Sequence, residues 1–118
     1  MRTTLSLIVI RVADLAASVR FYALLGLHFA QEQHGAGPIH FSATIGETLI
    51  ELYPASPNKT TQCLRLGFMI PELNDTIQHL VSIGAKLISP PTHSPWGYRA
   101  VICDLDGHTL ELTELKTD

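Results

Sequence analysis

The chain has 118 residues, 46% of them hydrophobic and 16% charged, which is typical of one globular domain. Its net charge is −3 at pH 7 and no basic patch is visible, which argues against a nucleic-acid-binding protein. No apolar run approaches the ~18 residues of a membrane span, and the N-terminus does not resemble a signal peptide. Cys63 and Cys103 are too few for a disulfide framework, so we expect one cytoplasmic domain with free thiols.

The first half of the chain shows the pattern of a strand, a helix and three further strands. The apolar, β-branched run Leu5–Val12 predicts a buried strand. Asp14 is a good N-cap for the helix that follows, whose stripe is Leu15, Ser18, Phe21, Tyr22 and Leu25. Gly26 suits the left-handed residue after that helix. Further strands are expected at Leu27–Gln31, Ile39–Ile45 and Thr48–Tyr53.

The second half follows a polar, proline-containing linker, Pro54–Gln62, and shows the same order of elements. A strand is expected at Cys63–Ile70, and then a helix with its apolar side at Leu73, Ile77, Leu80 and Gly84. Lys86–Ile88 predicts a short strand and Ser89–Pro95 a proline-rich loop. The last strands are expected at Tyr98–Asp104 and His108–Thr113.

These two halves are copies of one module. Val12-Ala13-Asp14-Leu15 is repeated as Ile70-Pro71-Glu72-Leu73, and Gly46-Glu47-Thr48-Leu49-Ile50-Glu51-Leu52 is echoed by Gly107-His108-Thr109-Leu110-Glu111-Leu112. We place module one at about residues 4–54 and module two at about 63–116 of a single domain, 1–118. Two modules related by a pseudo-two-fold would share a cleft, in which equivalent residues of each module could meet.

Strand parity separates a buried face from a mixed face in each module. Positions such as Ile10, Ile50, Phe68 and Leu110 are uniformly apolar and should pack beneath the helices. The other face, which we expect to line the cleft, carries Leu7, Val9, Arg11, Leu49, Glu51, Arg65, Gly67, Met69, Thr109 and Glu111. Glu51 and Glu111 stand within otherwise apolar strands, so their carboxylates need partners.

Four further motifs accompany the repeated segments, namely Phe21-Tyr22, Leu25-Gly26-Leu27, Trp96-Gly97-Tyr98-Arg99 and Asp104-Leu105-Asp106-Gly107. In the repeated segments and in these motifs, the chain resembles the vicinal oxygen chelate superfamily. That superfamily contains glyoxalase I, bleomycin-resistance proteins and extradiol dioxygenases. The resemblance implies an α+β fold of two tandem βαβββ modules, which form a U-shaped, partly closed sheet around a cleft. It also implies a small organic ligand and a homodimer, while the charge and the short apolar runs predict that neither a nucleic acid nor a membrane is a partner.

Metal-dependent members of this superfamily carry up to four ligands on the inner strands. The resemblance places these positions at Leu7, Glu51, Arg65 and Glu111. Leu7 has no donor atom and Arg65 keeps its proton, so Glu51 and Glu111 remain as an incomplete set of metal ligands. We therefore expect no cofactor, with a divalent metal as the alternative. Arg65 would then occupy the electrostatic place of the metal and bridge both glutamates.

The sequence thus favours a binding protein of the bleomycin-resistance type. Its expected ligand-binding residues are Arg65, Trp96, Tyr98, Arg11 and Met69, of which Trp96 and Tyr98 would stack on a flat molecule. The alternative is a glyoxalase-like lyase or isomerase with Glu111 and Glu51 as catalytic residues, and a ligand-sensing domain is a third reading. The six histidines are expected to be structural or solvent-facing, although His40 and His93 can reach the cleft.

Overall fold

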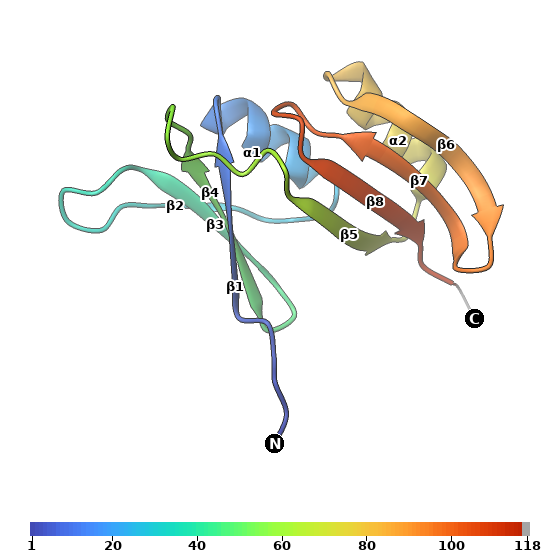
Figure 1. The fold of residues 1–118 in the computed structure, drawn as a ribbon, viewed down its shortest axis with the longest axis horizontal. Helices are drawn as coiled ribbons and strands as arrows, with labels where there is room; N and C mark the ends of the chain where they lie inside the picture. Colours follow the sequence, from blue (N-terminus) through green and yellow to red (C-terminus); the bar gives the residue numbers. More distant parts are fainter. Residues whose placement is uncertain (117–118) are drawn as a thin grey trace. The chain divides into compact units, whose positions relative to one another are not determined.

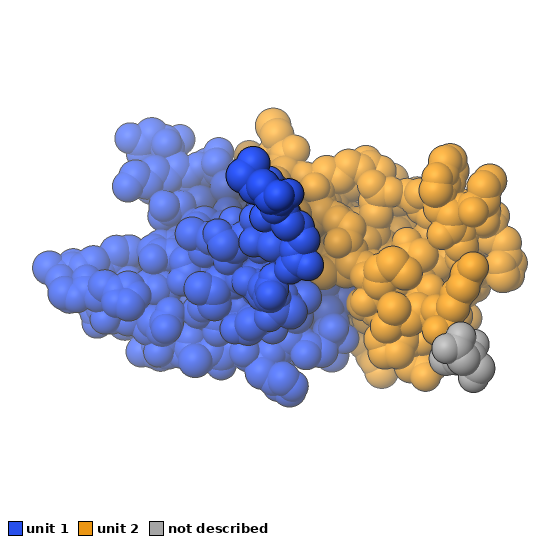
Figure 2. Space-filling view, turned by 90° about the horizontal axis from the view of Figure 1, so that it is seen from below, with its two compact units in different colours: residues 1–61 blue, residues 62–118 orange. Residues whose placement is uncertain are grey.

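The computed structural model describes residues 1–116, and the chain divides into two compact units, Met1–Thr61 and Gln62–Asp118 (Figure 2). Each unit contains a four-stranded sheet and one helix in the order βαβββ (Figure 1). The predicted α+β fold of two tandem modules is therefore confirmed. The two units are described one after the other.

The first unit begins with strand β1 (Leu7–Val12) and helix α1 (Leu15–Ala23). Strands β2 (Ala30–Glu32), β3 (His40–Ile45) and β4 (Thr48–Pro54) follow. The sheet has the order β1-β4-β3-β2, in which β1 runs parallel to β4 and the other pairs are antiparallel.

The second unit repeats this topology with β5 (Arg65–Ile70) and α2 (Leu73–Ser82). Strands β6 (Lys86–Ser94), β7 (Gly97–Cys103) and β8 (Thr109–Glu114) complete it. The order is β5-β8-β7-β6, with β5 parallel to β8, and α2 covers one face of the sheet (Figure 1).

The predicted start of the first helix is confirmed, whereas Leu25 and Gly84, which were predicted on the helix stripes, lie beyond the ends of α1 and α2. The Asp14 carboxylate accepts a hydrogen bond of 3.0 Å from the Ala17 amide, as expected of an N-cap. Gly26 and Gly84 have φ values of 92° and 117°, which favour glycine after a helix. At Gly84 a Cβ atom would also lie 2.8 Å from Leu105 Cδ2, so this position has no space for a side chain.

Strand parity predicted most of the core, although Phe68 is only half-buried. Ile10, Ile50 and Leu52 are buried in the first unit, as are Leu110 and Leu112 in the second. The helices add the core side chains Phe21, Tyr22, Leu73, Ile77 and Leu80. Leu7, Leu49 and Met69, of the opposite parity, are 41–59% exposed. Each sheet therefore has one face that packs against its helix and one that is largely open.

Two predicted boundaries were wrong. The strand expected at 27–31 forms only at Ala30–Glu32. The loop expected at 89–95 is instead the second part of β6, which continues to Ser94. Because β6 is the edge strand and its register shifts between Ser89 and Thr92, Pro90 and Pro91 need no ladder hydrogen bond there.

Within residues 1–116, no helix is long and apolar enough to cross a membrane. Both cysteines are free thiols, as predicted, with Cys63 exposed and Cys103 half-buried.

Candidate functional site

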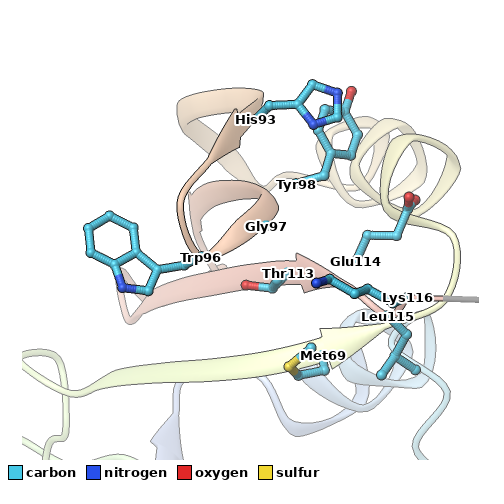
Figure 3. A pocket seen from close by; sticks show the side chains of 9 residues that line it. All are labelled: Met69, His93, Trp96, Gly97, Tyr98, Thr113, Glu114, Leu115 and Lys116. Atoms are coloured by element: carbon cyan, nitrogen blue, oxygen red, sulfur yellow. The ribbon is translucent and has the colours of Figure 1, made fainter.

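The second unit contains a cavity of about 700 Å³ at the side of its sheet where β5 and β8 end and β7 begins (Figure 3). Its walls come from β5, from the β6–β7 turn and from the end of β8, and its lining residues are Met69, His93, Trp96, Gly97, Tyr98, Thr113, Glu114, Leu115 and Lys116. Three of the predicted ligand-binding residues, Met69, Trp96 and Tyr98, thus line one cavity.

Aromatic rings stand at two ends of this cavity (Figure 3). The His93 and Tyr98 rings are 4.6 Å apart between centroids, and the Tyr98 hydroxyl donates a 2.9 Å hydrogen bond to Asn74 Oδ1 at the start of α2. Trp96 is 76% exposed and lies apart from that pair, where it also lines a smaller cavity of about 290 Å³. One aromatic group is thus anchored, while the other presents its indole to solvent.

The backbone at Gly97, which lines the cavity, passes close to Thr113 of β8. Gly97 has a φ of 119°, and a Cβ atom there would lie 3.3 Å from Thr113 Cγ2. A larger residue would be strained by its φ and crowded against β8. This glycine therefore lets the β6–β7 turn pack directly over the cavity wall.

Polar groups at the end of β8 were missed by the sequence analysis. Glu114 Oε2 accepts a 3.1 Å hydrogen bond from the Leu73 amide, so this carboxylate is occupied at the start of α2. The Lys116 side chain extends along the cavity toward Thr113 (Figure 3). Extending the parity of Thr109 and Glu111 by two residues would have found Thr113, but Lys116 follows the end of the strand, where parity no longer applies.

Glu111, the predicted catalytic or metal-binding carboxylate, is paired with two arginines. Arg65 Nε donates to Glu111 Oε2 at 2.7 Å, and the Arg99 guanidinium pairs with Oε1. The predicted Arg65–Glu111 pair is therefore present, and Arg99 is an additional partner that the sequence analysis missed. Arg99 also lies over the Trp96 ring, 5.9 Å from its centroid.

The first unit holds the other predicted site residues, Glu51 and Arg11. The Glu51 side chain is 14% exposed, and its Oε2 lies 3.9 Å from Nε2 of His40. The Arg11 guanidinium donates to the Pro54 carbonyl oxygen at 3.4 Å and lies 4.9 Å from the Tyr53 ring centroid. Whether Arg65 also reaches Glu51 stays a prediction, because the two residues belong to different units.

The residues at the four positions implied by the resemblance do not fit a glyoxalase-type metal centre. Leu7 supplies no donor atom, Arg65 donates to Glu111, and both Glu111 oxygens are already paired with guanidinium groups. Two other groups of described residues bring potential ligand atoms within 4.8 Å of one another. They are Glu32, His34 and His40 in the first unit, and Asp104, Asp106 and His108 in the second.

Comparison with known proteins shows the family of the chain. Residues 4–112 match the family model of the Glyoxalase/Bleomycin resistance protein/Dioxygenase superfamily. A search among curated proteins gives no match.

Solved structures resemble the chain over nearly its whole length. TnmS3, an antibiotic binding protein from Streptomyces sp. CB03234, is 20% identical, covers 98% of both chains and has a TM-score of 0.74. A glyoxalase-related enzyme from Fulvimarina pelagi is 19% identical, covers 97% of this chain and 89% of its own, and has a TM-score of 0.73. A glyoxalase/bleomycin resistance protein/dioxygenase family enzyme from Burkholderia phytofirmans PsJN is 20% identical, covers 97% and 100%, and has a TM-score of 0.73. Identities this low show the shared fold alone.

Proposed function

Because the chain belongs to the Glyoxalase/Bleomycin resistance protein/Dioxygenase superfamily, we propose that it binds a small organic molecule in the cavity of its second unit. The observation that carries the proposal is the cavity of about 700 Å³ between the Trp96 indole and the His93–Tyr98 pair. Pockets for drug-sized molecules have volumes of about 300–1,000 Å³ and mostly apolar walls. The cavity therefore suits a ligand of that size.

The lining residues indicate the chemistry of the ligand. Met69, Leu115 and the aromatic rings offer apolar contacts and flat stacking surfaces. Lys116 adds a positive charge that suits an acidic or carbonyl group. Arg65, which was also predicted to bind the ligand, does not line this cavity, and its guanidinium is paired with Glu111. A planar, partly aromatic molecule with one acidic or carbonyl group meets these conditions.

Binding without bond chemistry is the function we favour, because Glu111 is occupied. In the alternative, a metal-dependent lyase or isomerase, Glu51 and Glu111 would hold the metal or move a proton. The two guanidinium groups on Glu111 compete with both roles. The structural similarity to TnmS3, which is described as an antibiotic binding protein, also supports sequestration of a toxic compound.

Trp96 makes the proposal directly measurable, because it is the only tryptophan of the chain and lines the cavity. We would titrate the protein with bleomycin and a panel of planar aromatic antibiotics while following tryptophan fluorescence and thermal unfolding. Binding should change the fluorescence and raise the unfolding temperature. For an acidic ligand, Lys116→Ala should weaken the affinity about fivefold to tenfold, which corresponds to ~1 kcal/mol.

Lys86→Ala is the control for the loss of one positive charge, because Lys86 is an exposed lysine of β6 that does not line the cavity. If Lys86→Ala and Lys116→Ala weakened the affinity equally, the net charge of the protein, and not the lysine in this cavity, would attract the ligand. Turnover of the hemithioacetal of methylglyoxal and glutathione after addition of Ni²⁺ or Zn²⁺ would favour the lyase instead.

A further inference from the structure

A second polar cluster lies in the first unit, at the edge of the sheet formed by β2 and β3. Glu32 and His40 are directly opposite each other in the antiparallel ladder, and His34 stands in the connection between the two strands. The His34 and His40 rings are 5.1 Å apart between centroids. One ligand atom from each of the three residues lies within 4.8 Å of the others.

His40 is the unusual member, because it is only 1% exposed and its Nε2 has no hydrogen-bond partner. Its other ring nitrogen, Nδ1, lies 3.2 Å from the Pro38 carbonyl oxygen. A carbonyl oxygen only accepts, so Nδ1 carries the proton of the neutral ring and Nε2 presents a lone pair. A buried polar atom of this kind requires an explanation.

The Nε2 lone pair faces carboxylates. Glu32 Oε1 lies 3.5 Å and Glu51 Oε2 3.9 Å from it. These three atoms are all electron-rich, so a positive charge between them would stabilise the arrangement. Either a proton on Nε2 or a metal ion supplies that charge.

The distances favour a metal ion. A protonated Nε2 would draw a carboxylate to about 2.7–2.9 Å, the length of a charge-assisted hydrogen bond. Two ligands of one tetrahedral zinc ion, each at about 2.0–2.2 Å from the metal, lie roughly 3.3–3.6 Å apart. The separation of 3.5 Å between Nε2 and Glu32 Oε1 is close to the second value.

The His40 ring is fixed by a backbone carbonyl and by an aromatic neighbour, as is common for histidines that bind metals. Such histidines commonly donate their second N–H to a backbone carbonyl, which fixes the tautomer, and Pro38 accepts here. Tyr53 stacks on the His40 ring with centroids 4.2 Å apart and planes 8° apart. The nitrogen is therefore pre-oriented toward the carboxylates.

We propose that Glu32, His34 and His40 bind one divalent transition-metal ion of the zinc type. Two imidazoles and one carboxylate form a three-residue ligand set that Zn²⁺ accepts, with the fourth position open to water. The ion ties the connection between β2 and β3 to the sheet. The three residues of this site differ from the glyoxalase-type positions at Leu7, Glu51, Arg65 and Glu111, and the site does not depend on the ligand cavity of the second unit.

The other potential cluster, in the second unit, differs because its central carboxylate is occupied. Asp104 accepts from the Asp106 and His108 amides at 3.0 and 2.9 Å, and its Oδ2 lies 2.8 Å from His108 Nδ1. These contacts already stabilise the turn before β8. Asp106→Asn therefore serves as a control in which a carboxylate beside a histidine is removed outside the proposed site.

The test is a titration of chelator-treated, untagged protein with Co²⁺, a spectroscopic substitute for Zn²⁺. We expect visible ligand-field absorption that saturates at one ion per chain and is displaced by Zn²⁺. Glu32→Gln and His34→Gln should each weaken Co²⁺ binding at least about tenfold. Their side chains are substantially exposed, so the core should remain folded, which circular dichroism would verify.

Asp106→Asn and Glu111→Gln should leave the affinity for Co²⁺ unchanged. The proposal would be overturned if the wild-type protein bound no Co²⁺, or if Glu32→Gln and His34→Gln bound it as tightly as the wild type. Loss of binding in Glu111→Gln alone would also overturn it, because that result would place the ion at the glyoxalase-type positions.

Discussion

Each carboxylate oxygen of Glu111 is paired with a different arginine. The two arginines differ in exposure: the Arg65 side chain is 56% exposed and that of Arg99 is 25% exposed. Solvent screens an exposed ion pair much more than a half-buried one. We therefore expect Arg99 to contribute more than Arg65 to the stability of this unit.

Arg99→Ala should lower the free energy of unfolding by about 1–2 kcal/mol, because it removes a charge-assisted contact and packing against Trp96. Arg65→Ala should cost about 0–1 kcal/mol, since Arg99 remains on Glu111. Urea unfolding monitored by circular dichroism would measure both. Arg2→Ala is the control, because its pair with Glu47 is 3.9 Å long and almost fully exposed. A larger loss for Arg65→Ala than for Arg99→Ala would contradict this ranking.

Strand parity predicted the open-face residues, but it did not predict which strands would bring them together. Arg65 and Glu111 were expected to be partners because parity puts both on the open face and the resemblance places both at metal-ligand positions. Arg99 and His40 lie on the third strands, whose register depends on hairpin turns and bulges. A shift of one residue in strand register moves every side chain of that strand to the other face of the sheet. The contacts of Arg99 and His40 could therefore not be derived from the sequence.

The two helices start differently although they occupy equivalent positions in the repeat. Asp14 caps α1 through its own side chain, whereas Glu72, at the N-cap of α2, makes no side-chain hydrogen bond. In α2 the Leu73 amide donates instead to Glu114 of β8, 41 residues further along the chain. The first helix is thus capped locally and the second by tertiary contact.

This difference predicts that substitution of the N-cap residue by alanine destabilises the protein more at α1 than at α2. Asp14→Ala should lower the free energy of unfolding by about 1 kcal/mol, the usual cost of losing an N-cap. Glu72→Ala, its counterpart in the repeat, should change it by less than about 0.5 kcal/mol. Chemical denaturation of the two variants provides the comparison. Equal losses would mean that Glu72 also caps its helix in solution.

At the level of elements, the continuation of β6 past Pro90 was the main feature that sequence patterns did not predict. Two adjacent prolines normally indicate a loop, and the residues around them are polar. Prolines are tolerated in β6 because it is an edge strand, which forms hydrogen bonds with a neighbouring strand on one side only. The Thr92 hydroxyl further supports the bulge by donating to the Pro90 carbonyl oxygen at 2.9 Å. Edge or central position is a property of the sheet and cannot be read from one segment.

At the scale of the whole molecule, the question is whether two units of about 60 residues each form one domain. Each unit has its own core, centred on Phe21 and Tyr22 in the first and on Leu73 and Leu80 in the second. Domains of this size bury only about 60% of the surface of their unfolded chain and are marginally stable. Apolar side chains such as Met69 and Ile88 also remain more than half exposed. We therefore propose that each unit needs further burial, against the other unit or in a homodimer.

This proposal predicts that the isolated second unit, residues 62–118, unfolds at a clearly lower urea concentration than the full chain. If each unit covers apolar surface of the other, the full chain should unfold in one cooperative transition. Measurements at several protein concentrations would separate the contribution of a homodimer, whose stability rises with concentration. Two separate transitions in the full chain, one coinciding with that of the fragment, would show that the units are independent domains. The repeat would then consist of two self-sufficient modules, and a ligand bound in the second unit would stabilise only that unit.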